Sequence, residues 1–209
     1  MDAAVAARLA AGIAKLGLKL APAQLAALAT FVAELADWNT RMNLTAITDP
    51  AEVVDKHLLD SLAVLPWLKG HSVADVGSGA GFPGLPLAVA DPERRYSLIE
   101  STGKKVKFLR HVIERLELPN VDVLLGRAEA LKPSQPFDSV ISRALGPLSD
   151  FVRMAGHLAG RHGHLLAMKG RVPAEELKAL PPGWKALAVH PIRVPGLDAE
   201  RCLVELARV

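Results

Sequence analysis

Residues 74–86 read ADVGSGAGFPGLP, in which an acid, Asp75, is followed by glycines at every second position, Gly77, Gly79 and Gly81. A short apolar run precedes the acid, and a helix-like stretch follows the glycines. Glycine lets the backbone adopt positive φ angles and approach a ligand closely. A turn of this kind between a strand and a helix is typical of a cofactor-binding loop at the carboxyl end of a parallel sheet.

Short apolar runs alternate with helical stretches in the sequence around and beyond this loop. We expect strands at residues 73–76, 96–99, 121–125, 139–142 and 164–168, and helices at 84–90, 103–117, 147–159 and 173–180. This alternation predicts an α/β fold, a mostly parallel sheet with helices on both faces. Two strand-like runs at 184–194 and 201–209 are joined only by PGLDAE, which predicts an antiparallel pair at the edge of the sheet.

The pattern upstream of the loop is helical. Pro22 opens a helix with apolar residues three to four positions apart, and we expect this helix to end at Asn39. The period of the pattern changes near residue 70. The sequence therefore predicts an N-terminal helical cap over residues 1–70 and a cofactor-binding domain over residues 71–209.

Composition and charge limit the classes of protein to consider. Among 209 residues there is one cysteine, Cys202, which cannot build a disulfide framework or a thiolate metal cluster. No His or Cys motif with metal-ligand spacing is present, and we expect no metal. The N-terminal stretch is interrupted by Asp2, Arg8 and Lys15, so we expect no signal peptide. We expect a cytoplasmic protein without a membrane partner, and the net charge of +3 is compatible with nucleic acid.

Two cofactor classes compete for the glycine loop, and a turn without a ligand is the third possibility. Residues 79–84 fit the dinucleotide pattern G-x-G-x-x-G. A pyrophosphate needs backbone N–H groups, but Pro83 lacks one and Asp75 adds a negative charge. S-adenosylmethionine has no phosphate and carries an ammonium and a sulfonium, so the charges favour it. Glu100, at the end of the second predicted strand, could accept ribose hydroxyls from either cofactor.

Six strings in this sequence together resemble the bacterial small-subunit ribosomal RNA methyltransferase G family, also called glucose-inhibited division protein B. The glycine loop alone is a general methyltransferase signal, and the combination of strings is more specific. The strings are WNTRMNLT (38–45), HLLDSL (57–62), DVGSGAGFPGLPLA (75–88), FDSVISRA (137–144), AMKG (167–170) and RCLVEL (201–206). The resemblance, which extends from Trp38 to Val209, implies a class I, Rossmann-like methyltransferase. Its reaction would move a methyl group from S-adenosylmethionine to N7 of guanine 527 in 16S ribosomal RNA.

The resemblance also implies roles for individual residues. At the second strand end the family often has Asp, and Glu100 keeps the carboxylate with a longer reach. Arg143, in ISRA, is expected in a catalytic role as well as at the cofactor. The residues expected to bind the cofactor are Asp75, Gly77, Ser78, Gly79, Gly81, Phe82, Glu100, Ser101, Thr102, Ala128, Glu129 and Arg143.

The chemistry of N7 methylation calls for positioning more than for a catalytic base. N7 of guanine already carries a free lone pair, so no proton has to leave before it attacks the methyl carbon. Arg143 could hold O6 of guanine or the cofactor carboxylate. Lys169 and Arg201, both at strand ends, are predicted RNA contacts. His57 and Asp60, on the helix face opposite the leucines, are predicted to line the RNA entrance, with a solvated helix face as the alternative.

The expected partner is 16S ribosomal RNA, with the assembled small subunit as one form of the substrate, and the protein is expected to be a monomer. Two other functions remain open from the sequence. One is an NAD-dependent oxidoreductase, because the glycine loop also fits the dinucleotide pattern. The other is an RNA-binding protein that keeps a vestigial cofactor pocket.

Overall fold

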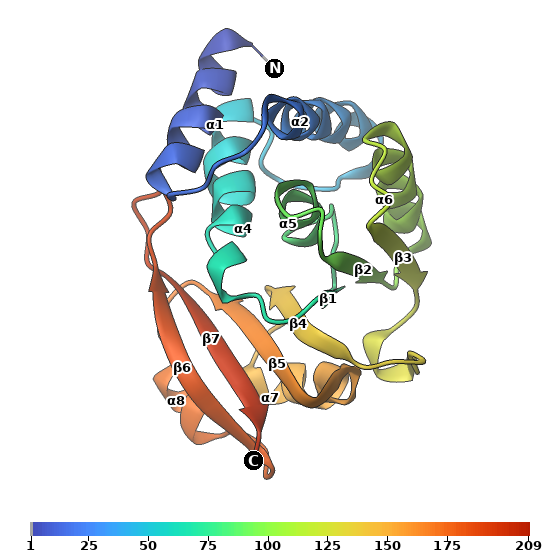
Figure 1. The fold of residues 1–209 in the computed structure, drawn as a ribbon, viewed down its shortest axis with the longest axis vertical. Helices are drawn as coiled ribbons and strands as arrows, with labels where there is room; N and C mark the ends of the chain where they lie inside the picture. Colours follow the sequence, from blue (N-terminus) through green and yellow to red (C-terminus); the bar gives the residue numbers. More distant parts are fainter. Residues whose placement is uncertain (1) are drawn as a thin grey trace.

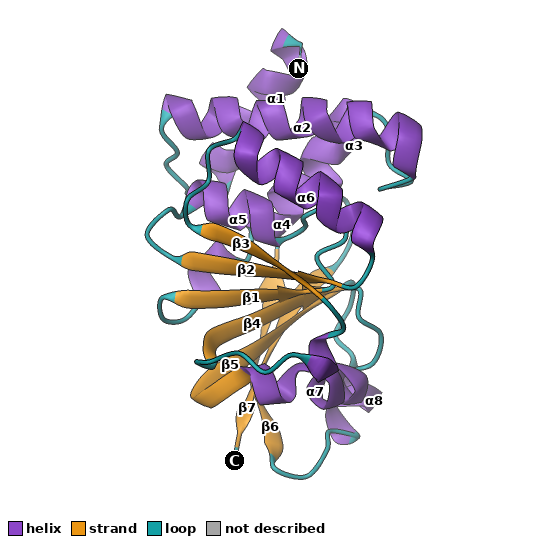
Figure 2. Ribbon diagram, turned by 90° about the vertical axis from the view of Figure 1, so that its right-hand side faces the viewer, coloured by secondary structure: helices purple, strands orange, loops and turns teal. Residues whose placement is uncertain are grey.

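A single seven-stranded sheet organises residues 2–209, the part of the chain that this computed structural model describes (Figures 1 and 2). The order of the strands is β3-β2-β1-β4-β5-β7-β6. Neighbours from β3 to β5 run parallel, and β7 runs antiparallel to both β5 and β6. The strands are β1 (Ser72–Val76), β2 (Arg95–Glu100), β3 (Val121–Leu125), β4 (Phe137–Arg143), β5 (Ala159–Lys169), β6 (Trp184–Ile192) and β7 (Arg201–Arg208). The predicted parallel sheet with an antiparallel edge pair is confirmed.

The order of the strands creates a switch point beside β1. From β1 the chain winds outward to β2 and β3, then returns to place β4 on the other side of β1. The loops that leave β1 and β4 therefore diverge, and a crevice forms beyond the carboxyl ends of these two strands. This is the position at which the glycine loop begins.

Both faces of the sheet are covered, because alternate residues of its central strands enter two different cores. In β4, for example, Ile141 packs in one core and Val140 in the other. Helices α5 (Gly84–Ala90) and α6 (Gly103–Arg115) cover the first face, and α7 (Leu148–Ala155) covers the second. The short helix α8 (Ala174–Lys178) contacts α7, as Figure 2 shows.

The N-terminal helices are α1 (Ala3–Lys15), α2 (Pro22–Met42), α3 (Pro50–Val53), a π-helical segment (Val54–Leu59), α4 (Asp60–Leu62) and a 3₁₀ turn (Leu65–Trp67). Helix α2 packs on α5 and α6, α4 lies beside α5, and α1 contacts α3 and the π-helical segment (Figure 1). One apolar core contains cap residues such as Phe31 and Leu59 together with sheet residues such as Val73 and Leu203. Because this core crosses residue 70, the division into a cap (1–70) and a second domain (71–209) stays a prediction.

Two predicted helix ends are wrong by three or more residues, and those of α6 and α8, predicted at residues 117 and 180, lie at Arg115 and Lys178. Helix α2 continues past Asn39 to Met42 and ends at Asn43, which takes a left-handed conformation with φ 46°. The Asn39 amide is used to hold the next loop, since it accepts from Thr45 N–H (2.9 Å) and donates to Thr45 O (3.0 Å). Helix α7 ends at Ala155, and β5 begins at Ala159, because a 3₁₀ turn replaces the last predicted helical turn.

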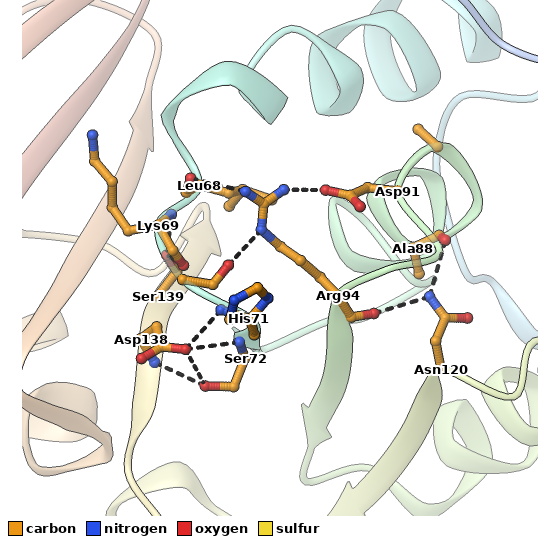
Figure 3. Close-up of polar contacts among 12 residues, drawn as sticks. Leu68, Lys69, His71, Ser72, Ala88, Asp91, Arg94, Asn120, Asp138 and Ser139 are labelled. Atoms are coloured by element: carbon orange, nitrogen blue, oxygen red, sulfur yellow. Dashed lines mark hydrogen bonds and ion pairs between the residues drawn. The ribbon is translucent and has the colours of Figure 1, made fainter.

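The joint between the cap and β1 is fixed by the carboxylate of Asp138 at the start of β4 (Figure 3). Its Oδ2 accepts hydrogen bonds from His71 N–H (2.8 Å), Ser72 N–H (2.9 Å) and the Ser72 hydroxyl (2.9 Å). Burial alone would raise the pKa of Asp138, but these hydrogen bonds outweigh it and lower the pKa from its ordinary value. The joint is therefore held by a carboxylate in its charged form.

Arg94 and Gly70 complete this joint at the amino ends of the strands (Figure 3). Arg94 Nε donates to Gly70 O (2.7 Å), Nη2 donates to Leu68 O (3.4 Å), and Nη1 pairs with Asp91. Gly70 has φ +62°, and a Cβ atom at this position would overlap the side chain of Asp138. Only glycine fits this close approach without strain.

Candidate cofactor and substrate site

The glycine-rich loop between β1 and α5 is a tightly fixed turn. Gly77, Gly79 and Gly81 have φ angles of 73°, 59° and 92°, in the region that favours glycine. A Cβ atom on Gly81 would overlap the side chain of Leu85. The N–H groups of Gly77 and Ser78 both donate to Ile99 O, at 2.9 and 3.1 Å, and so bind the loop to β2. The local geometry explains why this stretch needs glycine at alternate positions.

Asp75 lies beneath this loop, with only 1% of the residue exposed. Its Oδ2 accepts from the N–H of Gly84, the first residue of α5, at 2.9 Å, while Oδ1 has no hydrogen-bond partner among residues 2–209. Burial raises the pKa of Asp75 to about 7, against the opposing effect of the Gly84 hydrogen bond. The side chain points into the protein and supports the loop from within, and the predicted contact of Asp75 with the cofactor stays a prediction.

A cavity of about 200 Å³ opens at the carboxyl ends of β1, β2 and β3. Five of the predicted cofactor residues line it, namely Gly77, Glu100, Ser101, Ala128 and Glu129. Arg127, Leu145 and Met154 also line the cavity, and they were not predicted because none of them stands in a cofactor motif. The remaining predicted cofactor residues lie outside the cavity wall, namely Asp75, Ser78, Gly79, Gly81, Phe82, Thr102 and Arg143.

Within residues 2–209, two acids line this cavity, Glu100 and the more exposed Glu129. Glu100 is the one that lies at the end of a strand, β2. Its Oε2 accepts from Gly79 N–H (3.0 Å) and its Oε1 from Thr102 N–H (2.8 Å). Each oxygen keeps a further lone pair for a ligand. A carboxylate held at both oxygens, together with apolar walls from Ile99 and Leu145, fits a nucleoside with free ribose hydroxyls.

The guanidinium of Arg143, at the end of β4, lies in a cluster beside the glycine loop. Its Nη1 donates to Lys56 O (3.1 Å), lies 3.2 Å from His57 Nδ1 and pairs with Asp60 Oδ2 at 3.4 Å. The same guanidinium lies over the ring of Phe82, 5.2 Å from its centre. The structure thus brings Arg143, Phe82 and His57, three separately predicted site residues, into contact.

Asp60 bridges this cluster to Arg201, at the start of β7. Its Oδ1 accepts from Arg201 Nε at 3.1 Å, while Oδ2 faces Arg143. Asp60 is 3% exposed. The alternative of a solvated helix face at His57 and Asp60 is therefore wrong. The π-helical segment, which carries His57, and α4, which begins at Asp60, pack their leucines in the core and still bury these two polar residues.

His57 is a buried, neutral member of the cluster. Its Nε2 lies 2.9 Å from the Thr45 hydroxyl, and its ring lies 4.6 Å from the ring of Phe82 between centres. Burial, and then the charge of Arg143, lower the pKa of His57 to about 4. At neutral pH the imidazole is therefore uncharged and cannot compete with Arg143 for an anion.

Lys169, the other predicted RNA contact, lies apart from this cluster at the end of β5. Its Nζ donates to Gly146 O (2.6 Å) and Glu176 Oε2 (2.7 Å), and its side chain is 18% exposed. Glu176 also accepts from Leu148 N–H at the start of α7. Lys169 therefore holds the loop that follows β4, and its contact with RNA stays a prediction.

No group of three or more His, Cys, Asp or Glu side chains within residues 2–209 is arranged to hold a metal ion. Nor does any helix in the described residues combine the length and apolar character that crossing a membrane requires.

Solved structures with the same architecture are methyltransferases. The glycopeptide N-methyltransferase MtfA, crystallised with S-adenosylhomocysteine, has a TM-score of 0.63 and 10% identity, over 73% of this chain and 87% of that one. A SAM-dependent methyltransferase from Aquifex aeolicus has a TM-score of 0.55 and 20% identity, over 76% and 93%. At these identities the likeness shows the fold, and the predicted class I, Rossmann-like methyltransferase fold is confirmed.

Sequence relatives identify the family. The family model described as "rRNA small subunit methyltransferase G" matches residues 24–204. A protein of that name from Azoarcus sp. (strain BH72) is 52% identical over 204 residues, 97% of this chain and 96% of its own length. Its namesake from Marinobacter nauticus is 45% identical over 197 residues, 94% and 92% of the two chains. Since the match covers nearly the whole chain in each comparison, this protein belongs to the rRNA small subunit methyltransferase G family.

Proposed function

We propose that this protein transfers the methyl group of S-adenosylmethionine to N7 of guanine 527 in 16S ribosomal RNA. Membership of the family makes it a small-subunit rRNA methyltransferase, and the target nucleotide and atom are the finer part of the proposal. One observation carries it: a nucleoside-sized cavity and a fixed arginine both lie at the carboxyl ends of the parallel strands.

The cavity has the groups that S-adenosylmethionine needs. Glu100 would accept hydrogen bonds from the ribose hydroxyls, and Ala128 and Leu145 would enclose the adenine. When bound, the cofactor supplies an electrophilic methyl carbon. A dinucleotide pyrophosphate fits less well, because Glu100 already accepts the N–H of Gly79, a backbone donor of the loop.

The cluster around Arg143 offers no free base, and the reaction does not need one. The imidazole of His57 has Nδ1 beside Arg143 and Nε2 on Thr45, so both of its nitrogens are engaged. N7 of guanine attacks through a lone pair that exists at neutral pH. The contribution of the protein is then to hold the base in line with the methyl group.

Arg143 can perform that positioning only through one edge of guanine. An arginine fork usually grips O6 and N7 together. A donor on N7 would occupy the lone pair that must attack the methyl carbon. We therefore assign Arg143 to O6, with Nη1 held by the protein and with Nε and Nη2, which have no acceptor among residues 2–209, facing the substrate. The target base must be unpaired or flipped out, since the major-groove edge of paired RNA is inaccessible.

Methylation of small subunits from a strain that lacks this gene tests the proposal. The protein is incubated with those subunits, or with naked 16S RNA, and cofactor labelled in its methyl group. The label is mapped by reduction and strand cleavage at 7-methylguanine. We expect label at guanine 527 alone. Binding without label would favour the RNA-binding alternative, and label at another nucleotide would contradict the assigned target.

A further inference from the structure

We infer that Asp60 is a positioning residue that joins Arg143 and Arg201 into one rigid substrate-binding unit, which we call the arginine pair. The inference rests on the proposed function and deepens it. It assigns the unit to a guanine together with a neighbouring RNA phosphate.

In the arginine pair, the carboxylate of Asp60 is shared between the guanidinium groups of Arg143 and Arg201. Asp60 Oδ1 accepts from Arg201 Nε at 3.1 Å, and Oδ2 pairs with Arg143 Nη1 at 3.4 Å. The Asp60 side chain is 5% exposed, whereas those of Arg143 and Arg201 are 23% and 28% exposed. The carboxylate is thus inside, and both guanidinium groups reach the surface.

The charges explain why an acid is needed at this position. Two guanidinium groups brought to one carboxylate would repel each other and turn toward water if that carboxylate were neutral. The carboxylate of Asp60 is buried, and a buried charge without a partner is strongly unfavourable. Both arginines are therefore held against Asp60. Arg143 lies at the end of β4 and Arg201 at the start of β7, two segments far apart in the chain, and Asp60 contacts both side chains.

The free edges of the arginine pair define the ligand. Arg143 keeps Nε and Nη2 free of acceptors within residues 2–209, and Arg201 keeps Nη2, since its Nη1 donates to Glu200 O. Arg143 reaches O6 of the target base, as proposed above. Arg201, more exposed, is then available to a phosphate of the adjoining backbone.

Asp60 also acts on the charge that develops during the reaction. As the N7–carbon bond forms, the carbon–sulfur bond breaks with its electron pair going to sulfur, so the positive charge moves from the sulfonium to the guanine ring. An unscreened arginine beside the ring would oppose that movement. The carboxylate of Asp60 offsets it, so loss of Asp60 should lower kcat more than it weakens cofactor binding.

Asp55, in the π-helical segment that leads into α4, supplies a matched control. It is also a buried acid, 5% exposed, and its carboxylate is paired with an arginine, Arg8, that has no contact with the Arg143 cluster. Loss of charge at Asp55 therefore reproduces the structural cost of losing a buried acid in this helix. It does not touch the arginine pair.

The first test compares Asp60→Asn with Asp55→Asn. We measure kcat and KM on undermethylated small subunits, S-adenosylhomocysteine affinity by calorimetry, and the urea midpoint. Asp60→Asn should lower kcat about a hundredfold, the effect of a small misplacement of reacting groups, with cofactor affinity within about threefold. Asp55→Asn should leave kcat and KM within about twofold of the wild type. A kcat of Asp60→Asn near the wild-type value, or an equal loss in both variants, would overturn the inference.

A second test needs no variant of Asp60 and no RNA. Nuclear magnetic resonance relaxation gives order parameters for the Nε–H groups of arginines in the wild-type protein, with Arg201→Lys used for assignment. Arg143 and Arg201 should approach about 0.85, and the exposed Arg127 should fall below about 0.6. Low values at both arginines would overturn the arginine pair. Rigid arginines in a protein that transfers no methyl group would instead refute the proposed function.

Discussion

The two ends of the parallel strands are built in opposite ways. At the amino ends, Asp138 and Arg94 satisfy backbone groups of the joint, and no cavity is needed there. At the carboxyl ends, the glycine loop and the loop after β4, with Ala144 at φ 65°, adopt left-handed conformations around a cavity. The first end closes the structure, and the second exposes oriented polar groups. Stability and catalysis are thus assigned to different ends of the same sheet.

A pair of aspartates shows the same contrast in electrostatic terms. Asp138, at the amino end, is exposed and accepts three hydrogen bonds, which lower its pKa. Asp75, at the carboxyl end, is buried with one oxygen that has no partner in the part of the chain that the structure describes, and burial raises its pKa to about 7. The carboxyl end therefore carries an electrostatic cost that the amino end avoids.

The largest effect on this contrast should come from Arg143→Ala. Removal of the guanidinium leaves Asp60 paired with Arg201 but removes the group that holds the base, so methyl transfer should fall about a hundredfold or more. Single-turnover rates with small subunits measure the change. Arg94→Ala, which removes an arginine from the amino end, is the control and should reduce stability with little effect on the rate. A similar loss of rate in both variants would remove the distinction between the two ends.

Gly70→Ala should give the next largest effect, at the other end of the sheet. The new Cβ would overlap Asp138, and alanine at φ +62° adds backbone strain. We expect a loss of about 3 kcal/mol in the free energy of unfolding, from overpacking and strain together. Urea unfolding measures it. Methyl transfer by the folded fraction should stay near the wild-type rate, and a selective loss of activity would contradict the assignment of this end to stability.

The smallest effect should be the pH dependence that Asp75 gives to stability. Because the pKa of Asp75 is raised to about 7 from 3.8, the folded state holds a proton that the unfolded state has lost. Stability should therefore fall as the pH rises, by up to about 2 kcal/mol between about pH 5 and about pH 7. Asp75→Asn keeps an acceptor for Gly84 N–H and should remove this fall, as urea unfolding at each pH would show.

Asp138→Asn is the matched variant for that measurement. The lowered pKa of Asp138 contributes stability that is present above its ordinary pKa and is lost as the pH falls through the lowered value. Its effect on pH dependence should therefore appear below about pH 4 and leave the range from about pH 5 to about pH 7 unchanged. If the stability of the wild-type protein did not change between about pH 5 and about pH 7, the pKa of Asp75 would not be raised by burial.

The sheet was predictable because its signals are local. Apolar runs and glycines at the loop depend only on neighbouring residues, and they predicted β1 to β5 and the edge pair. The resemblance to the family predicted a role for Arg143, whereas His57 and Arg201 were predicted from their places on a helix face and at a strand end, and the roles of all three stay predictions. The direction in which Asp75 points was not predictable, since a strand residue at the end of a run can face either way. Glu176 and the bridging contact of Asp60 depend on segments far apart in the chain, for which one sequence carries no pattern.

The π-helical segment Val54–Leu59 has a consequence for how the length of this chain can vary. A π-helical turn holds about one residue more than the α-helical turn that it replaces. Removal of one residue within Val54–Leu59 would restore regular winding and leave Asp60 facing β4. Removal of one residue from the regular turn Pro50–Val53 would instead rotate everything before it by about 100° relative to α4. A one-residue deletion in this helix should therefore be tolerated in the π-helical segment before it is tolerated in the regular turn that precedes it.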